Sequence, residues 1–151
     1  MKVYLATDHA GFELKEKIRQ YLQGVGFEVE DFGAHSFNPE DDYPDFISKA
    51  AGAVSKDPES KAIILGGSGQ GEAIVANKFP GVRAAVYYGS AEQMPSLTRQ
   101  HNDSNILSLG ARFLKEEDAI SAVGLFLKTP FTNEERHIKR IEKIKKIEQE
   151  L

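Results

Sequence analysis

The sequence has no cysteine, which excludes disulfide bonds, a thiolate nucleophile and a cysteine-bound zinc site. It also has no apolar run of transmembrane length, and the N-terminal segment reaches Asp8 before any signal-like apolar region forms. The charges nearly balance, with a net charge of −4, so electrostatics give no reason to expect a nucleic-acid partner. We therefore expect a cytoplasmic protein with no nucleic-acid or membrane partner.

The two common nucleotide-binding motifs are absent as well. The glycine-rich stretch from Gly66 to Glu72 is not followed by the Gly-Lys-Ser/Thr of a Walker A motif. The first predicted strand runs into Asp8-His9-Ala10-Gly11, where a dinucleotide-binding fold would carry GxGxxG. Nucleotide binding is therefore disfavoured.

What the sequence does contain is a regular alternation of strand-like and helix-like segments, over a length of 151 residues that fits one domain. Strands are predicted at residues 3–6, 27–32, 61–65, 82–88 and 105–109. Helices are predicted at 13–22, 46–54, from the glycine-rich stretch to about 79, 91–100 and 116–127. Such alternation favours a Rossmann-like three-layer α/β/α fold, in which a five-stranded parallel sheet is covered on both faces. The order of the strands does not follow from the sequence.

A charged tail helix is predicted over about residues 134–151, after the last strand–helix unit. Its apolar residues form a narrow stripe, too thin for a deeply buried helix, of Ile138, Ile141, Ile144, Ile147 and Leu151. The helix could lie across its own domain or dock on a partner subunit. Because it has no strand to cover, we favour a place at a subunit interface.

The stretch Gly66-Gly67-Ser68-Gly69-Gln70-Gly71-Glu72 has the pattern of a loop between a buried strand and a helix. Glycine lets the backbone adopt positive φ and approach a ligand closely, and the N–H groups at a helix start face an anion. Glu72 falls in the predicted first turn, where a carboxylate is favoured. A carboxylate beside N–H donors could take a proton from carbon while the donors hold the resulting enediolate. The alternative is a tight turn in which Glu72 only stabilises the helix.

Other polar residues gather near the ends of strands. Asp8 and His9 follow the first strand and so share a sheet edge with the glycine-rich loop, where open α/β sheets bind ligands. A helix cap for Asp8 and a solvated loop residue for His9 are the alternatives. Residues 101–105, His-Asn-Asp-Ser-Asn, place more polar groups between a helix and a buried strand than a C-cap and a turn explain. His101 is the natural proton donor or acceptor near neutral pH.

Basic residues in the last third of the chain are candidate phosphate ligands. Arg112 follows the fifth predicted strand. Arg136 and Arg140, with His137 beside them, are four residues apart and so lie on one face of the tail helix, as a two-pronged anion clamp requires. The alternative is a solvated basic face that the neighbouring glutamates balance.

These motifs together resemble one family, the type B ribose-5-phosphate isomerases, which also contains allose-6-phosphate isomerases and the subunits of galactose-6-phosphate isomerase. The resemblance runs from the first strand to the tail helix. It is carried by Asp8-His9-Ala10-Gly11-Phe12, Tyr43-Pro44-Asp45, residues 66–77, His101-Asn102-Asp103, Gly110-Ala111-Arg112, and Arg136-His137 with Arg140. It implies an aldose–ketose isomerisation of a phosphorylated sugar through a cis-enediolate, with no metal and no organic cofactor.

The resemblance also implies a role for each matching residue. Glu72 would be the base that moves the proton, and His101 the acid–base group for ring opening. The remaining matches would bind substrate: Asp8, His9, Tyr43, Gly67, Ser68, Gly69, Gln70, Gly71, Asn102, Arg112, Arg136, His137 and Arg140. Among them, residues 67–71 would form the anion hole for the enediolate, and the arginines would hold the phosphate.

Two positions depart from the family pattern. Many members carry, at the position of Gly66, the cysteine that shuttles the proton, and this chain resembles instead the branch in which a glutamate at Glu72 is the base. Asn133-Glu134-Glu135 stands where some members have glycines before the Arg-His pair. The second departure concerns the shape of the binding site where the phosphate would lie, and the length of the sugar that the site would accept.

The leading hypothesis is a ribose-5-phosphate isomerase of the pentose phosphate pathway, which interconverts ribose 5-phosphate and ribulose 5-phosphate. One alternative is the same reaction on a six-carbon sugar phosphate, such as allose or galactose 6-phosphate. Another is a non-catalytic module that binds sugar phosphates. Glu72 and His101 together argue against the module, because binding alone needs neither a base nor an acid.

The order of the predicted elements places Glu72 and His101 at opposite edges of one sheet. The glycine-rich loop follows the third strand at the carboxyl edge, whereas His101 ends a helix just before the fifth strand. A strand of about five residues spans about 16 Å, too far for a single proton-transfer site. We therefore predict a homodimer, or a tetramer of two such dimers, with active sites shared between two subunits.

Overall fold

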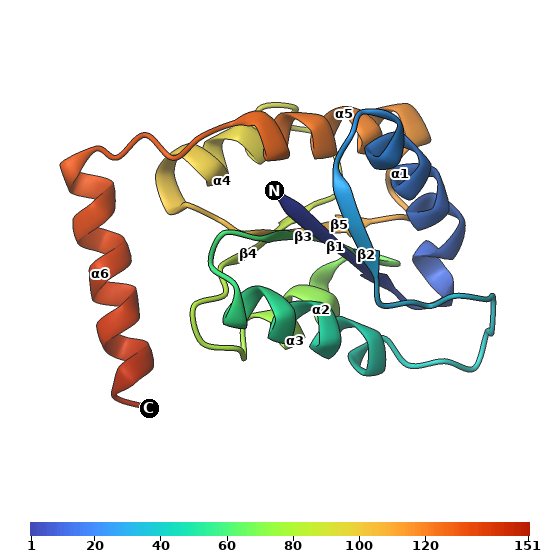
Figure 1. The fold of residues 1–151 in the computed structure, drawn as a ribbon, viewed down its shortest axis with the longest axis horizontal. Coiled ribbons are helices and arrows are strands. Elements are labelled where there is room, and N and C mark those ends of the chain that lie inside the picture. Colours follow the sequence, from blue (N-terminus) through green and yellow to red (C-terminus); the bar gives the residue numbers. More distant parts are fainter.

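The fold is organised around a parallel sheet of five strands, seen in the computed structural model, which describes residues 1–151 (Figure 1). The strands are β1 (Lys2–Thr7), β2 (Glu28–Asp31), β3 (Lys61–Gly66), β4 (Ala84–Tyr87) and β5 (Ile106–Gly110). Their order is β2-β1-β3-β5-β4, and every neighbouring pair is parallel. The predicted three-layer α/β/α fold is confirmed.

The helices alternate with the strands along the chain, as the sequence predicts. They are α1 (Phe12–Gly24), α2 (Pro44–Lys56), α3 (Gln70–Ala76), α4 (Met94–Asn102), α5 (Glu116–Lys128) and α6 (Glu135–Gln149), and a short 3₁₀ turn covers His9–Gly11. None of them combines the length and the apolar character that a membrane crossing requires.

The predicted boundaries differ from the observed ones by three residues at the end of α3 and at the start of α4. Helix α3 ends at Ala76 rather than near Phe79, because the Asn77 side chain turns toward the start of β4. Its amide accepts from the Ala84 N–H at 2.8 Å and donates to the Ala84 carbonyl at 3.1 Å. The same bonds mark the point where β4 begins, two residues later than predicted.

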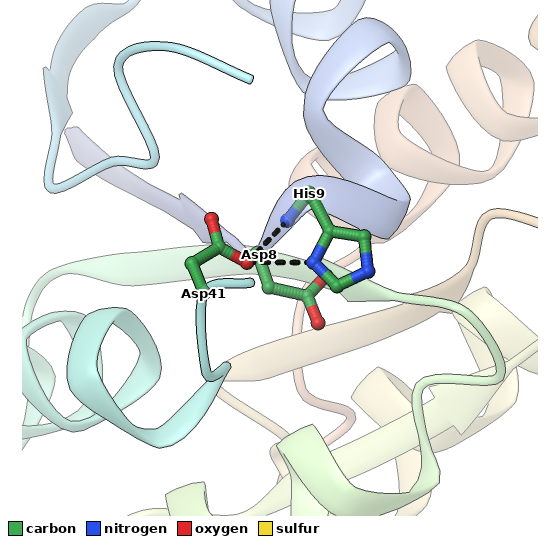
Figure 2. Close-up of side chains that lie close together, drawn as sticks. All are labelled: Asp8, His9 and Asp41. Atoms are coloured by element: carbon green, nitrogen blue, oxygen red, sulfur yellow. Dashed lines mark hydrogen bonds and ion pairs between the residues drawn. The ribbon is translucent and has the colours of Figure 1, made fainter. Parts of the chain in front are cut away.

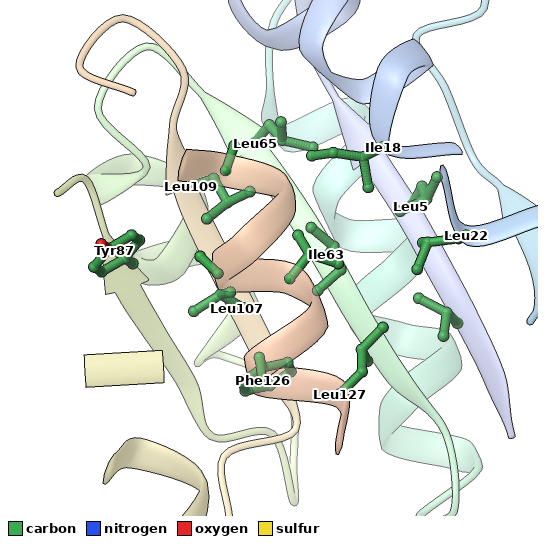
Figure 3. Close-up of a cluster of buried hydrophobic side chains, with 14 residues drawn as sticks. Leu5, Ile18, Leu22, Ile63, Leu65, Tyr87, Leu107, Leu109, Phe126 and Leu127 are labelled. Atoms are coloured by element: carbon green, nitrogen blue, oxygen red, sulfur yellow. The ribbon is translucent and has the colours of Figure 1, made fainter. Parts of the chain in front are cut away.

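Each face of the sheet has its own apolar core. Helices α1 and α5 cover one face, where Leu5, Ile63, Leu109 and Phe126 belong to a cluster of 14 buried residues (Figure 3). Helices α2 and α3 cover the other face, as Figure 1 shows, over a cluster of 11 buried residues. Because central parallel strands are buried on both faces, β1 and β3 read as continuous apolar runs in the sequence.

A buried lysine fixes the chain where it leaves β2 for the long loop before α2. The Lys15 side chain is fully buried, and its ammonium group donates to the Asp31 carboxylate at 2.5 Å and to the Ala34 carbonyl at 2.7 Å. Beside it, the Ala34 N–H donates to the Thr7 carbonyl at the end of β1. Charge pairing and hydrogen bonding are what allow a lysine to be buried here. The loop after β2 is thereby held against the carboxyl edge of the sheet.

Helix α6 stands away from the layered body (Figure 1). Only His137 and Ile141 of this helix are buried, and near its far end the Gly81 N–H donates to the Glu148 carboxylate at 3.0 Å. The rest of the predicted apolar stripe remains exposed, with Ile147 61% exposed. An uncovered apolar stripe of this kind is typical of a surface that meets another protein.

Candidate active site

The carboxyl ends of three adjacent strands bring together most of the residues predicted to carry chemistry. Asp8 and His9 follow β1, the glycine loop follows β3, and Arg112 follows β5. In the strand order β2-β1-β3-β5-β4, these three strands are neighbours. The strand order reverses direction at β1 and β3, and crevices at such points are where open α/β sheets bind ligands.

The glycine loop (Gly66–Gly71) is held rigidly against the end of β5. Three hydrogen bonds engage its carbonyl groups: Ala111 N–H to Gly66 at 2.8 Å, Arg112 N–H to Gly67 at 3.1 Å, and the buried Ser108 hydroxyl to Gly69 at 2.7 Å. Gly69 has a φ of 79°, in the left-handed region that favours glycine.

The N–H groups of the same loop are arranged differently from its carbonyls. Those of Gly67, Ser68 and Gly69 donate to no backbone carbonyl of the chain. Consecutive N–H groups before a helix start form a concave site that suits an anion. The loop is therefore preorganised to hold negative charge on a ligand.

Glu72 lies in the first turn of α3, as predicted, and its carboxylate is packed against the backbone at Gly66. A Cβ atom at Gly66 would overlap this carboxylate, so the absence of a side chain there makes room for the glutamate. Glu72 is 4% exposed. Burial raises the pKa of its carboxyl group, and the charge of Asp8 acts in the same direction. A carboxyl with a raised pKa beside free N–H donors can accept and return a proton.

Tyr43 and Arg112 flank the glycine loop. The Tyr43 hydroxyl lies so close to Gly71 that any Cβ atom at that position would overlap it. Arg112 is exposed and lies over Gly67, where a Cβ atom would be 3.1 Å from its Nη1. Both predicted substrate-binding residues thus lie beside the loop that precedes Glu72, at the carboxyl edge of the sheet.

Asp8 has the capping role that the sequence left open, in addition to its place at the carboxyl end of β1. Its carboxylate accepts from the Ala10 N–H at 3.0 Å at the start of the 3₁₀ turn. Asp8 is buried, and its charge affects both Glu72 and His9.

His9 is held by Asp41, a residue that the sequence analysis did not single out (Figure 2). One Asp41 carboxylate oxygen lies 2.7 Å from His9 Nδ1 and 2.9 Å from the His9 backbone nitrogen. This hydrogen bond raises the pKa of His9; the charge of Asp8 adds to the rise, and Arg112 opposes it. The available signal was position alone, since Asp41 stands two residues before Tyr43 in the loop that returns to the crevice.

Asp8, His9 and Asp41 are also the one group of acidic and imidazole side chains in the chain with metal-like spacing. Their ligand atoms lie within 4.8 Å of one another. Three of their atoms are engaged within the chain: His9 Nδ1 and Asp41 Oδ1 are bonded to each other, and Asp8 Oδ1 accepts from the Ala10 N–H.

The second group of predicted residues lies where α4 meets α6. His101 and Asn102 end α4, and the His101 ring stacks on the ring of His137 with centroids 4.5 Å apart. Burial lowers the pKa of His137, and the charges of His101 and Arg136 act in the same direction. Arg136 and Arg140 are exposed on α6.

The structure does not bring these two groups together within one chain. Asn102 lies beside the start of β4, because its carbonyl accepts from Arg83 Nε at 3.0 Å. Glu72 lies at Gly66, whose pairing partner Gly110 is four residues beyond Ile106 at the start of β5. Four strand residues span about 13 Å. This separation agrees with the placement of Glu72 and His101 at opposite sheet edges that the element order predicts.

Comparison with known proteins identifies the family. The family model described as Ribose/Galactose Isomerase matches residues 3–144. The chain belongs to the ribose/galactose isomerase family. A curated relative, ribose-5-phosphate isomerase B of Mycolicibacterium paratuberculosis, is 42% identical over 142 residues, which cover 94% of this chain and 88% of the relative.

Solved structures of family members share the whole fold. The ribose-5-phosphate isomerase B of Mycoplasma genitalium, solved with bound ribulose-5-phosphate, has a TM-score of 0.95 and 38% identity, covering 99% of this chain and 97% of that one. The Clostridium thermocellum ribose-5-phosphate isomerase B has a TM-score of 0.93 and 42% identity, covering 99% of both chains. The family resemblance inferred from the sequence motifs is confirmed.

Proposed function

We propose that this chain is a ribose-5-phosphate isomerase that interconverts ribose 5-phosphate and ribulose 5-phosphate. The observation that carries the proposal is the buried Glu72 carboxylate beside the free N–H groups of Gly67–Gly69. A proton transfer at carbon needs a base and a site for the charge that develops on oxygen, and this crevice supplies both. Relatives named ribose-5-phosphate isomerase B support the choice of sugar.

In the proposed reaction, Glu72 removes the proton from C2 of the open-chain aldose. Electrons of the broken C–H bond form the C1–C2 double bond, and negative charge collects on O1, which faces the N–H groups of the glycine loop. Glu72 then returns the proton to C1 while the proton on O2 passes to O1, which leaves the ketose with a carbonyl at C2 and a hydroxyl group at C1. Because the same carboxyl accepts and returns the proton, a raised pKa suits both halves of the step.

The proposal includes a second subunit. His101 would open the sugar ring, yet it lies at the other end of the sheet from Glu72 of its own chain, so the partner of a homodimer would supply it. Helix α6 would lie at that subunit interface, where Arg136 and Arg140 hold the phosphate. The exposure of His101, of both arginines and of the α6 apolar stripe supports this arrangement.

The proposal also covers domain organisation and location. Residues 1–151 would act as one isomerase domain, and Asp8, His9, Tyr43, Asn102, Arg112 and His137 would complete the binding site with the glycine loop. The reaction belongs to the pentose phosphate pathway. A phosphorylated sugar is charged and does not cross membranes freely, which supports the cytoplasmic location expected from the sequence.

A six-carbon sugar phosphate is the second candidate substrate, because the matching family model covers galactose as well as ribose isomerases. The decisive measurement is kcat/KM on a panel of five- and six-carbon aldose phosphates. We expect ribose 5-phosphate to be preferred. A preference of tenfold or more for a hexose phosphate would overturn the choice of sugar while leaving the reaction class intact.

Catalysis itself is tested by proton exchange. In deuterated water, the enzyme should introduce deuterium at C2 of ribose 5-phosphate, because the enediolate intermediate can take up a solvent proton on its way back. A module that only binds sugar phosphates would bind without exchange, and that outcome would refute the proposed function.

A further inference from the structure

Asp41 makes an unusual pair of contacts with a single residue. It lies in the loop between β2 and α2, and its side chain is 9% exposed. One carboxylate oxygen, Oδ1, accepts from both the backbone N–H and the ring Nδ1 of His9, at 2.9 and 2.7 Å (Figure 2). Two bonds from one oxygen to one residue fix both the backbone and the ring of that residue.

The bond to Asp41 determines which ring nitrogen of His9 is free. An ionised carboxylate only accepts hydrogen bonds, so Nδ1 must carry a proton. The other ring nitrogen, Nε2, faces away from Asp41 in Figure 2 and is left for a ligand. The exposed Phe37 ring packs edge-on against the imidazole, with centroids 6.2 Å apart. The ring is therefore oriented from two sides, and Nδ1 is held protonated by Asp41, so Nε2 carries an N–H when the ring is an imidazolium.

The second oxygen of Asp41 suggests that the carboxylate is retained for more than stability. Oδ2 is buried and has no hydrogen-bond partner. A buried charged oxygen without a donor is unfavourable for folding. An asparagine could accept the same two bonds through its carbonyl oxygen, without a charge to bury. What asparagine could not supply is the negative charge beside the imidazole.

We propose that Asp41 is a positioning residue, which orients His9 and keeps its Nε2 as an N–H donor to the phosphate of the bound sugar. The ionisable groups that face His9 are Asp8, Asp41 and Arg112. The two carboxylates favour the imidazolium, and Arg112 adds a second positive group on the same side of the crevice. A pair of cationic donors suits a phosphate better than a neutral hydroxyl group. The phosphate assignment rests on the proposed function, whereas the Asp41–His9 pairing does not.

The substitution Asp41→Asn tests the effect of the negative charge of Asp41 apart from the effect of its size and shape. It keeps the size of the side chain and an oxygen that can accept both bonds, so we expect the protein to fold. Asp42→Asn is the matched control, because it removes the same charge one residue away at an exposed side chain. Asp41→Ala removes both the charge and the acceptor, and should resemble Asp41→Asn in its effect on ligand binding or exceed it.

The first measurement is the titration of His9 by NMR, assigned through a His9→Gln variant, in the absence of sugar. Asp41→Asn should lower the pKa of His9, and Asp42→Asn should leave it close to the wild-type value. A His9 pKa that is unchanged in Asp41→Asn would refute the proposal, whatever the activity of the enzyme.

The second measurement is the pH profile of KM and kcat for ribose 5-phosphate. Between the His9 pKa of the variant and that of the wild type, Asp41→Asn should raise KM roughly tenfold with little change in kcat, because phosphate is held in both ground and transition states. At lower pH, where His9 is protonated in both proteins, the difference should shrink. A lowered His9 pKa with a KM profile equal to that of Asp42→Asn would show that Asp41 only supports the loop.

The third measurement is a titration with inorganic phosphate, which does not depend on isomerase activity. Inorganic phosphate should shift the His9 ring signals of the wild-type protein at lower concentration than those of Asp41→Asn. If the wild-type protein fails to isomerise any sugar phosphate, the proposed function falls, and this titration still decides the role of Asp41. Equal phosphate binding by the two proteins at a pH between their two His9 pKa values would reject that role.

Discussion

The carboxyl edge of the sheet and the α4–α6 end of the same chain are built in contrasting ways. At the carboxyl edge, Glu72 is buried, the carbonyls of the glycine loop are bonded to β5, and His9 is fixed by Asp41. At the α4–α6 end, His101 and the two arginines of α6 are exposed, and the apolar stripe of α6 is largely uncovered.

This contrast indicates which part of the chemistry one chain can organise alone. Groups that must stabilise developing charge have to be in place before the reaction, and the sheet edge holds them so. The groups at the α4–α6 end lack that support within the chain. Under the proposed function, the second subunit supplies this support. Each folded monomer then carries two halves of an active site, of which only the half at the carboxyl edge is held in place by its own chain.

The most direct test of the carboxyl edge is Glu72→Gln. This substitution keeps the shape of the side chain but removes the base, so kcat should fall by about 10²–10⁴ while phosphate binding stays nearly intact. Glu13→Gln, at an exposed glutamate in the first turn of α1, is the matched control and should keep normal turnover. Retention of more than about a tenth of wild-type kcat would mean that another group is the base.

Mixed dimers test whether the two ends belong to one active site across subunits. Glu72→Gln and His101→Asn should each be nearly inactive, and their co-expression should restore activity that neither has alone. Each mixed dimer would contain one site with both residues intact, so random pairing should recover about a quarter of wild-type sites. If purified mixed dimers are as inactive as the parents, the shared site is excluded.

Gly66→Ala tests how closely the base depends on its surroundings. The added Cβ atom would overlap the Glu72 carboxylate, which must then move away from the N–H groups of the loop. A displacement of about 1 Å at a reacting group lowers the rate by about 10², so we expect a kcat reduction of that order. Gly24→Ala is the control, since a Cβ atom there meets nothing. Unchanged kcat in Gly66→Ala would show that Glu72 acts from a different position.

Arg136→Ala and Arg140→Ala test the exposed end. Loss of one charge-assisted bond to phosphate should weaken binding by about 1.5–3 kcal/mol, which raises KM roughly 10- to 150-fold. The effect on kcat should be small, because the bond is made in both ground and transition states. Lys139→Ala removes an exposed charge from the same helix and should leave KM unchanged. An unchanged KM in both arginine variants would mean that α6 carries only a solvated charged face.

The smallest expected effect is a pH dependence of stability that arises at His137. Burial lowers its folded pKa, with His101, Arg136 and Arg140 acting in the same direction and Glu134 opposing them. The unfolded chain therefore takes up the proton first, and stability should fall as pH drops through about 6.5, the unfolded value. Thermal unfolding at pH 7.5 and 5.5 should show a smaller loss for His137→Gln than for wild type. The exposed His35→Gln variant should behave as wild type, and an equal loss in all three proteins would contradict this origin.

The elements of the fold follow from local patterns, whereas their arrangement in the sheet does not. Local patterns predict the strands and helices, because strands buried on both faces read as apolar runs and helices buried on one face show helical spacing. The placement of β5 between β3 and β4 depends on pairings between distant segments, such as Ile63 with Leu107, that leave no local mark.

The residues of the candidate site likewise include some that local patterns predict and some that they do not. Glu72, Asp8 and the glycine loop stand at strand ends, where sequence order alone predicts a shared edge. Asp41 lies within an irregular polar loop, so no periodic pattern marks it; the Lys15 contacts hold only the first residues of that loop, Asp31 and Ala34. His137 was expected at the phosphate; in the isolated chain its ring packs on His101, a contact that depends on where α6 leaves α5.

The fit of Glu72 against Gly66 restricts how this family can diverge. The sequence resemblance implies that many members carry a proton-shuttling cysteine at the position of Gly66, and in this chain the carboxylate of Glu72, the proposed base, fills that space. A Cβ atom at position 66 would overlap the Glu72 carboxylate in its present position, so a side chain there would force the carboxylate to move. A single change at either position yields an enzyme with a displaced base or with none. We therefore expect positions 66 and 72 to change together among descendants, with a cysteine accompanied by a smaller residue at 72 and a glycine accompanied by glutamate.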